Sequence, residues 1–144
     1  MTNDRYNKTV TQLVVRPSDL DSVGHVNNAC ALEYLEHGRW DWLCKNGLSR
    51  RSRIIPVVVR IEVDYGAEIP WANIQIETNL LEDDDLIYKA IFKQYIFVGF
   101  SKEAAVKAVV HVAFIDTDNR SVLTIHDFID EAKRLHGETK TLMP

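Results

Sequence analysis

The chain has 144 residues, of which 46% are hydrophobic and 26% charged, and its formal net charge is −4. This length and composition are typical of one globular domain, so residues 1–144 are expected to form a single unit. The negative balance, without a long basic run, disfavours nucleic acid as a partner, because phosphate contacts need clustered Lys and Arg. The sequence has no apolar run long enough to span a bilayer, so no membrane partner is expected.

The cysteines and the first residues point to an intracellular protein. Cys30 and Cys44 fall in one expected helix, about 21 Å apart at the helical rise, so they are too far apart to form a disulfide. The first residues, MTNDRYNKT, have no apolar core of the kind that a signal peptide carries. No Cys and His cluster has metal-ligand spacing, so no metal site is expected. A cytoplasmic protein with reduced thiols is the resulting prediction.

A strand, a loop and a long helix are the first elements expected. Residues 9–16 (TVTQLVVR) favour a strand, and Pro17 ends it because proline donates no hydrogen bond to a ladder. A polar loop over residues 18–27 follows. From Asn28 onward apolar residues recur near helical spacing and lie on more than one side, which predicts a well-enclosed helix. Gly47 is placed to be the left-handed residue that closes it.

Strands joined by short turns are expected in the second half of the chain. Residues 57–65 (VVVRIEVDY) alternate, which predicts a half-buried strand. Its apolar face would carry Val57, Val59, Ile61, Val63 and Tyr65. Further strands are expected over 73–82, 86–97 and 103–116, and a short amphipathic helix over 125–137. Because short turns join antiparallel strands, the pattern predicts an α+β fold with an antiparallel sheet wrapped around the long helix.

The loop before the helix carries an unusual set of polar residues. It reads Asp19-Leu20-Asp21-Ser22-Val23-Gly24-His25-Val26-Asn27-Asn28. This segment resembles the Asp-x-Asp-x-x-Gly-His-Val-Asn-Asn segment of hotdog-fold acyl-thioesterases, in the group named after 4-hydroxybenzoyl-CoA thioesterase. The order of the expected elements is similar to that of the family over nearly the whole chain. One departure is Ala31, where the family often has a tyrosine. A smaller residue there would alter the pocket that receives the acyl group.

The resemblance implies a single-domain hotdog fold and hydrolysis of an acyl-CoA or acyl-carrier-protein thioester, without cofactor or metal. Such hydrolysis needs a carboxylate that attacks the carbonyl carbon or activates a water, and donors that stabilise charge on the carbonyl oxygen. By resemblance, Asp21 is the nucleophile or general base, and the backbone N–H of Asn28 at the helix N-terminus polarises the oxygen. Loop position alone would make Asp21 an ordinary turn residue.

Other residues of the loop have supporting interpretations. Gly24 is suited to a positive φ or to a close approach of the acyl group. His25 either places water or is structural. Asn27 and Asn28 are good helix-capping residues. Asp19 is expected to organise the loop by binding backbone amides or a nearby basic residue.

Two further groups of residues are secondary candidates. Glu33 or Glu36 is the alternative carboxylate, because a second hotdog thioesterase group resembles this one but uses a helix glutamate. Arg50, Arg51 and Arg53 suit the phosphates of coenzyme A or of a carrier protein's phosphopantetheine arm, since guanidinium groups match phosphate geometry. The same arginines are also compatible with a solvated loop.

Two alternative functions remain open on the sequence. One is a hotdog dehydratase or hydratase acting on acyl carriers, although its histidine-containing motif is not present. The other is a non-catalytic acyl-binding module, since a fold does not guarantee chemistry. The resemblance also implies a homodimer or homotetramer, with the active site between subunits and strands that pair across the interface.

Overall fold

The computed structural model describes residues 6–139. Its elements, in chain order, are β1 (Thr9–Val14), the short 3-10 helix η1 (Pro17–Asp19), α1 (Asn28–Lys45), β2 (Ile54–Tyr65), β3 (Asn73–Leu81), β4 (Lys89–Val98), β5 (Val106–Asp116), β6 (Val122–Leu123) and α2 (Ile125–Thr139). The predicted order of strand, long helix, strands and terminal helix is confirmed. The two-residue strand β6 was not predicted.

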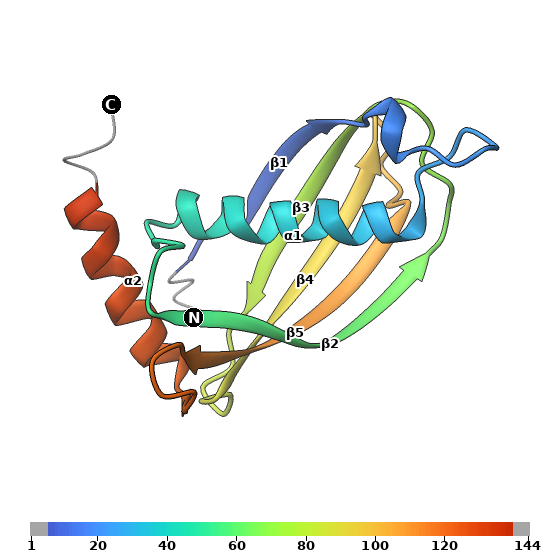
Figure 1. Cartoon of the computed structure of the whole chain (residues 1–144). Helices are drawn as coiled ribbons and strands as arrows, with labels where there is room; N and C mark the ends of the chain where they lie inside the picture. The colour runs from blue at the N-terminus through green and yellow to red at the C-terminus, as the bar shows by residue number, and fades with distance from the viewer. Residues whose placement is uncertain (1–5, 140–144) are drawn as a thin grey trace.

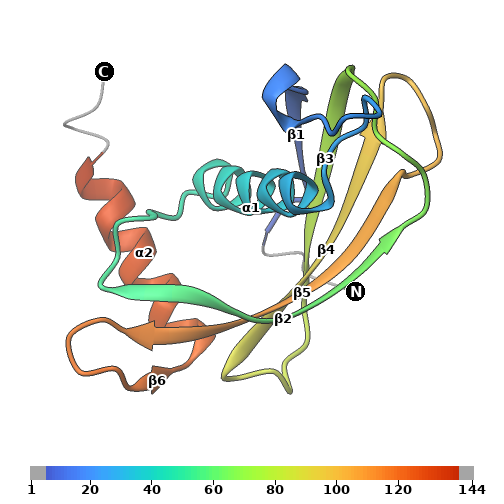
Figure 2. The same ribbon diagram turned by 45° about the vertical axis from the view of Figure 1, so that its right-hand side comes forward.

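One antiparallel sheet curves around α1, as the sequence predicted. Its strand order is β1-β3-β4-β5-β2, and β6 pairs with β5. Figure 1 shows α1 lying across the concave face of the sheet, and Figure 2 shows the sheet bending around the helix. The helix contacts chiefly β1 and β3. The edge strand β2 therefore lies apart from the helix that the rest of the sheet enfolds.

A glycine allows α1 to approach the sheet closely. A Cβ built on Gly38 would lie 2.7 Å from Ile76 Cγ2 and 2.9 Å from Thr78 Oγ1, inside van der Waals contact. Beside it the buried Gln94 side chain donates from Nε2 to the Leu35 carbonyl oxygen at 2.8 Å and to Thr78 Oγ1 at 2.9 Å. A polar network in the core thus joins the middle of α1 to β3 and β4.

The expectation that α1 would be enclosed on several sides is wrong for the single chain. Its buried residues are Ala31, Tyr34, Leu35, Gly38, Trp42 and Leu43, which face the sheet. Glu33, Glu36 and His37 are exposed. The helix therefore has one exposed side, which lies next to the edge strand β2.

A bulge in β2 inverts the predicted alternation. Val58 pairs with Val112 and Arg60 pairs with His111, so Val59 is left between them as an extra residue. The extra residue moves Val58 to the face that bears the buried Val112, and it moves Val57 to the opposite face. The prediction of a single apolar face for residues 57–65 is therefore wrong before the bulge and correct after it.

The strand β2 is also far more exposed than predicted. All residues from 57 to 62 are exposed, and Tyr65 at its end has 44% of its surface accessible. The reason is the position of α1, which contacts chiefly β1 and β3, at the opposite side of the sheet from β2. An apolar strand edge of this kind is available for pairing with another chain.

The C-terminal helix closes the end of the molecule at which α1 finishes. Gly47 has φ of 75°, as expected for the residue that closes a helix. The Ser49 N–H donates to the Ala132 carbonyl oxygen at 3.0 Å. The Phe114 and Phe128 rings stack with their centroids 4.8 Å apart. These contacts attach α2 to the loop after α1 and to β5.

Candidate active site

The polar loop forms a small hairpin seated against the start of α1. Leu20 and Val26 pair across it, and the Asn27 N–H donates to the Asp19 carbonyl oxygen at 2.9 Å. The Val26 N–H also donates to the Ile69 carbonyl oxygen at 2.8 Å, which attaches the hairpin to the turn between β2 and β3. The tip of the hairpin, with Asp21, is thereby held at the N-terminal end of the helix.

Asp21 is an exposed carboxylate that orders its own turn. Its Oδ1 accepts the N–H of Val23 at 2.9 Å and that of His25 at 3.1 Å. The hydrogen bond from the His25 backbone is the main reason why the pKa of the Asp21 carboxyl lies below its ordinary value. Oδ2 has no hydrogen-bond partner among residues 6–139. Asp21 is therefore ionised at neutral pH and has one free oxygen. The φ of Gly24 is 89°, the positive value that the sequence suggested.

The N-terminus of α1 offers an unpaired amide close to this loop. Asn27 is the cap: its side chain accepts the Ala29 N–H at 2.9 Å, and its carbonyl oxygen accepts the Ala31 N–H at 3.1 Å. Asn28 is the first helical residue, and its N–H has no acceptor within the described part of the chain. Free amides at the positive end of a helix are suited to bind a carbonyl oxygen that gains negative charge.

At the base of the hairpin, Asp19 is buried, and both of its carboxylate oxygens accept hydrogen bonds. Arg16 binds it with two hydrogen bonds of 3.0 Å, from Nε and Nη2, and the Tyr34 hydroxyl donates to its Oδ2 at 2.6 Å. The Arg16 bond is the main cause of a lowered pKa for the Asp19 carboxyl. Burial is the main cause of a raised pKa for Tyr34. Asp19 thus organises the loop through a basic residue, as expected.

His25 and Ala31 differ in their surroundings. The His25 Nε2 is 3.1 Å from Glu68 Oε2, so its side chain faces the turn between β2 and β3. Ala31 is buried in the core. One helical turn later, Tyr34 supplies a tyrosine hydroxyl to the loop. The sequence analysis did not single out Tyr34 for this role, although its spacing of three residues from Ala31 places both on one face of the helix.

The tyrosine at the end of β2 was also not given a functional interpretation. The Tyr65 hydroxyl donates to the Asn28 carbonyl oxygen at 3.2 Å. It therefore contacts the first turn of α1 directly. The alternation of residues 57–65 predicted only that Tyr65 would lie on the apolar face of the strand.

The three candidate arginines are far from Asp21 within one chain. They follow the C-terminal end of α1, and this helix of 18 residues is about 27 Å long at the helical rise. Arg53 is occupied by Asp116 at 3.2 Å and Glu131 at 3.7 Å. Arg50 lies over the Trp40 ring, 5.2 Å from its centroid, and Arg51 is exposed. The single chain does not bring this cluster to the loop.

The alternative carboxylates lie on the open side of α1. Glu33 is 3.9 Å from Arg16, and Glu36 accepts the Trp40 indole N–H at 3.3 Å. Within residues 6–139, no three His, Cys, Asp or Glu side chains are grouped as metal ligands would be. Cys30 and Cys44 are both free thiols.

The model of one protein family covers most of the chain. The family is described as the thioesterase-like superfamily, and the match extends over residues 15–141. The chain belongs to this superfamily. The predicted membership of the hotdog thioesterases is thereby confirmed. Among curated proteins, no sequence matches this one.

Solved structures of several other proteins share the architecture. A DHNA-CoA thioesterase from Staphylococcus aureus has a TM-score of 0.76 at 18% identity, covering 94% of this chain and 92% of that one. A probable thioesterase from Escherichia coli has a TM-score of 0.69 at 27% identity, covering 87% and 96%. One from Bartonella henselae has a TM-score of 0.70 at 24% identity, covering 82% and 97%. The single-domain hotdog fold is therefore confirmed for this superfamily member. In the described part of the chain, no helix has the length and hydrophobicity to cross a membrane.

Proposed function

We propose that this chain hydrolyses an acyl thioester of coenzyme A or of an acyl carrier protein in the cytoplasm, giving a carboxylic acid and a thiol. The observation that carries the proposal is the hairpin at the start of α1, which carries the ionised Asp21 at its tip and leads directly into the unpaired N–H of Asn28. Membership of the thioesterase-like superfamily supports the same reaction class.

The proposed reaction has two steps: attack of water on the thioester carbon, and breakdown of the resulting tetrahedral intermediate. The Asp21 carboxylate removes a proton from a water, and the water oxygen bonds to the thioester carbonyl carbon. The carbonyl oxygen gains the electron pair of the double bond, and the Asn28 N–H stabilises its negative charge. The carbon–sulfur bond then breaks, the thiolate leaves, and the proton held by Asp21 neutralises it. In the nucleophilic variant Asp21 itself attacks the carbon, and water hydrolyses the resulting anhydride.

The loop residues have supporting parts in this proposal. Gly24 provides the turn that brings two backbone amides onto Asp21, and Asn27 caps the helix so that the Asn28 amide is free. His25 joins the hairpin to Glu68. Ala31 stands where the family often has a tyrosine, and this smaller side chain bears on which acyl group is accepted.

A homodimer is the assembly that the exposed edge favours. The apolar residues of β2 lie at the sheet edge, and the open side of α1 is adjacent to it. Antiparallel pairing of two β2 strands would cover both and would bring the start of one α1 toward the end of its partner's. Arg50 and Arg51 of one protomer would then lie toward Asp21 of the other, where they could bind phosphates of the substrate. Arg53 is held by Asp116 and Glu131 and would support this loop.

The test of the reaction is thiol release from a panel of acyl-CoA and acyl-carrier-protein thioesters. The panel includes aryl thioesters, because the Staphylococcus aureus neighbour is named a DHNA-CoA thioesterase. We expect Asp21→Asn to reduce release at least about 100-fold, the range over which general acid–base groups act. Asp130→Asn, an exposed carboxylate on α2, is the matched control and keeps full activity.

Other results would assign the site differently. Unchanged release by Asp21→Asn would remove Asp21 from the mechanism and direct attention to Glu33 and Glu36. No release by the wild type from any thioester would favour the dehydratase or acyl-binding alternatives.

The assembly has its own test. Val59 is at the bulge, where it pairs with no residue of β5, and 58% of its surface is exposed. Val59→Asp therefore leaves the β2–β5 ladder intact but places a charge between two facing β2 strands. Light scattering should show a dimer or tetramer for the wild type and a monomer for this variant. Val122→Asp, at a similarly exposed valine on β6, should keep the wild-type mass. A monomeric wild type would contradict the proposal.

A further inference from the structure

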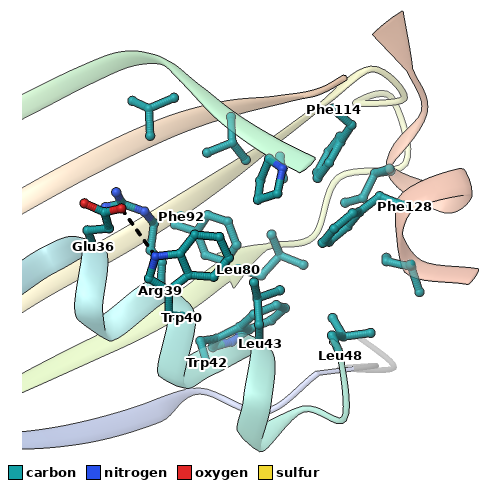
Figure 3. A pocket seen from close by; sticks show the side chains of 16 residues that line it. Glu36, Arg39, Trp40, Trp42, Leu43, Leu48, Leu80, Phe92, Phe114 and Phe128 are labelled. Carbon is teal, nitrogen blue, oxygen red and sulfur yellow. Dashed lines mark hydrogen bonds between the residues drawn. The ribbon is translucent and has the colours of Figure 1, made fainter. Parts of the chain in front are cut away.

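The two ends of α1 are attached to the rest of the chain in different ways. The second half of the helix is held by side-chain packing, with the Trp42 and Phe92 ring centroids 5.1 Å apart. Figure 3 shows that Trp42, Phe92 and Phe128 face the same interior space, from α1, β4 and α2. At the other end, residues 28 and 29 of the first turn are exposed. The position of the proposed oxyanion amide therefore depends on hydrogen bonds.

The connection that follows β2 makes contacts with both parts of the proposed site. The Tyr65 hydroxyl donates to the Asn28 carbonyl oxygen at 3.2 Å, in the first turn of α1. Glu68 and the carbonyl oxygen of the buried Ile69 contact residues 25 and 26 of the hairpin, at 3.1 Å and 2.8 Å. The end of β2 thus binds the hairpin and the start of the helix together.

Tyr65 is itself firmly placed by the sheet. It pairs with Val106 at the end of the β2–β5 ladder. The N–H groups of Gly66 and Ala67 then both donate to the Ala105 carbonyl oxygen, at 2.9 Å and 3.0 Å. These bonds lie on the side of β2 that faces β5, so pairing of the free edge with a second chain leaves them in place. The bond from Tyr65 to α1 is likewise made within one chain.

The carbonyl group that Tyr65 binds belongs to the residue whose N–H is proposed to stabilise the thioester oxygen. In an α-helix the Asn28 carbonyl oxygen also accepts the N–H four residues on, that of Leu32, and a carbonyl oxygen can accept two such bonds. An oxyanion donor is effective only when it is aimed at the position that the charged oxygen will occupy. A first turn that is less firmly held would therefore stabilise the transition state less well.

We propose that Tyr65 is a positioning residue for thioester hydrolysis: its hydroxyl holds the first turn of α1 so that the Asn28 N–H faces the thioester oxygen. The inference rests on the proposed function, and the role needs no contact between Tyr65 and the substrate. Because 44% of the Tyr65 surface is exposed, water can replace the hydrogen bond that Tyr65→Phe removes, and the fold is retained.

The kinetics of thiol release test this role, with the acyl-CoA that the wild type hydrolyses fastest as substrate. Tyr65→Phe should lower kcat about tenfold and leave KM within about twofold, because it weakens an interaction made in the transition state. The loss is smaller than the roughly 100- to 1,000-fold of a deleted oxyanion donor, since the Asn28 amide is displaced but not removed. Tyr88→Phe, at an exposed tyrosine between β3 and β4, should keep both constants.

Three further measurements separate positioning from folding and from assembly. Tyr65→Phe and Tyr88→Phe should unfold at the same urea concentration as the wild type. Light scattering should give both variants the wild-type mass. In hydrogen exchange, the Leu32 amide should exchange at least about threefold faster in Tyr65→Phe and at the wild-type rate in Tyr88→Phe, because only the first loosens the turn that Leu32 closes.

The possible results lead to different conclusions. If Asp21→Asn abolishes thiol release while Tyr65→Phe keeps the wild-type kcat, the role of Tyr65 is wrong and the proposed function stands. If Tyr65→Phe loses kcat only together with the mass of the oligomer, Tyr65 serves the subunit interface, and its positioning role is again wrong. A wild type that hydrolyses no thioester would overturn this role together with the proposed function, whatever the exchange rate at Leu32.

Discussion

The Tyr34 hydroxyl donates a hydrogen bond of 2.6 Å to Asp19 Oδ2. This bond joins the second turn of α1 to the base of the hairpin that carries Asp21. Arg16 binds both oxygens of the same carboxylate, so Oδ2 accepts from Tyr34 and from Arg16. The buried Asp19 carboxylate therefore fixes the base of the loop, whereas Asp21 lies at its exposed tip. The two partners of Asp19, Arg16 and Tyr34, lie outside the polar motif of residues 19–28.

Tyr34→Phe should destabilise the protein by about 1–2 kcal/mol, because it removes one of the donors to a buried carboxylate. Urea denaturation measures this change. Tyr95→Phe is the control, since the Tyr95 hydroxyl makes no hydrogen bond in the described part of the chain and only the ring contacts Phe97. Equal stability of Tyr34→Phe and Tyr95→Phe would mean that the Asp19 bond contributes nothing.

Asp19 should also contribute to the loss of stability in acid. Its folded pKa lies below the ordinary value of 3.8, so the folded state favours the carboxylate. The stabilisation is complete above the unfolded pKa of about 3.9 and is lost as the pH falls through the lower folded value. Asp19→Asn should therefore be less stable than the wild type at pH 7, and the difference should shrink below about pH 4. Denaturation curves between pH 7 and pH 2.5 would show a constant difference if Asp19 were not involved.

Gly38→Ala should destabilise the protein even though alanine favours helices. The new Cβ would lie 2.7 Å from Ile76 and 2.9 Å from Thr78, so α1 must move off the sheet. The expected cost is about 1–3 kcal/mol. Gly137→Ala in α2 is the matched control, because nothing lies within 4 Å of its added Cβ. Its expected effect is a gain of about 0.5–1 kcal/mol, from helix propensity alone. Similar changes in both variants would contradict the close approach at Gly38.

The sequence predicted those features that depend on local patterns. Helical spacing, strand alternation and turn residues located the long helix and the main strands within a few residues of their observed ends. Local chemistry also predicted the positive φ of Gly24, the capping role of Asn27 and the basic partner of Asp19. Each of these depends on neighbours close in the chain, which a single sequence displays directly.

Features that depend on tertiary placement were not predictable in the same way. Three consecutive valines, Val57 to Val59, fit either register of a strand, so nothing in the pattern marked the bulge. The exposure of β2 follows from where α1 lies, which alternation does not specify. The three arginines share a short segment, but only the folded chain assigns Arg53 to Asp116 and places the cluster at the far end of α1.

The same limit applies to the polar contacts of Arg39 in the middle of α1. Gln94, which orients Arg39, is separated from it by more than fifty residues and is a buried polar residue on an otherwise apolar strand face. Its interactions were therefore visible only in the folded chain.

The pH dependence of thioester hydrolysis distinguishes Asp21 from other bases. The active form is the carboxylate, and its pKa lies below 3.8 because backbone amides of the hairpin donate to it. Activity should therefore not decline between pH 7 and pH 5 as long as Asp21 is the acting group. The measurement is kcat/KM across this range, which reports the ionisation of the free enzyme.

The same pH profile also tests whether His25 is the catalytic base. Histidine is the residue type that ordinarily changes charge between pH 5 and pH 8, so a histidine base would produce a fall in kcat/KM within the range tested. We expect His25→Gln to keep the flat profile of the wild type, with a lower rate at all pH values because its contact with Glu68 no longer holds the hairpin. A fall between pH 7 and pH 5 in the wild type that disappears in His25→Gln would transfer the role of base from Asp21 to His25.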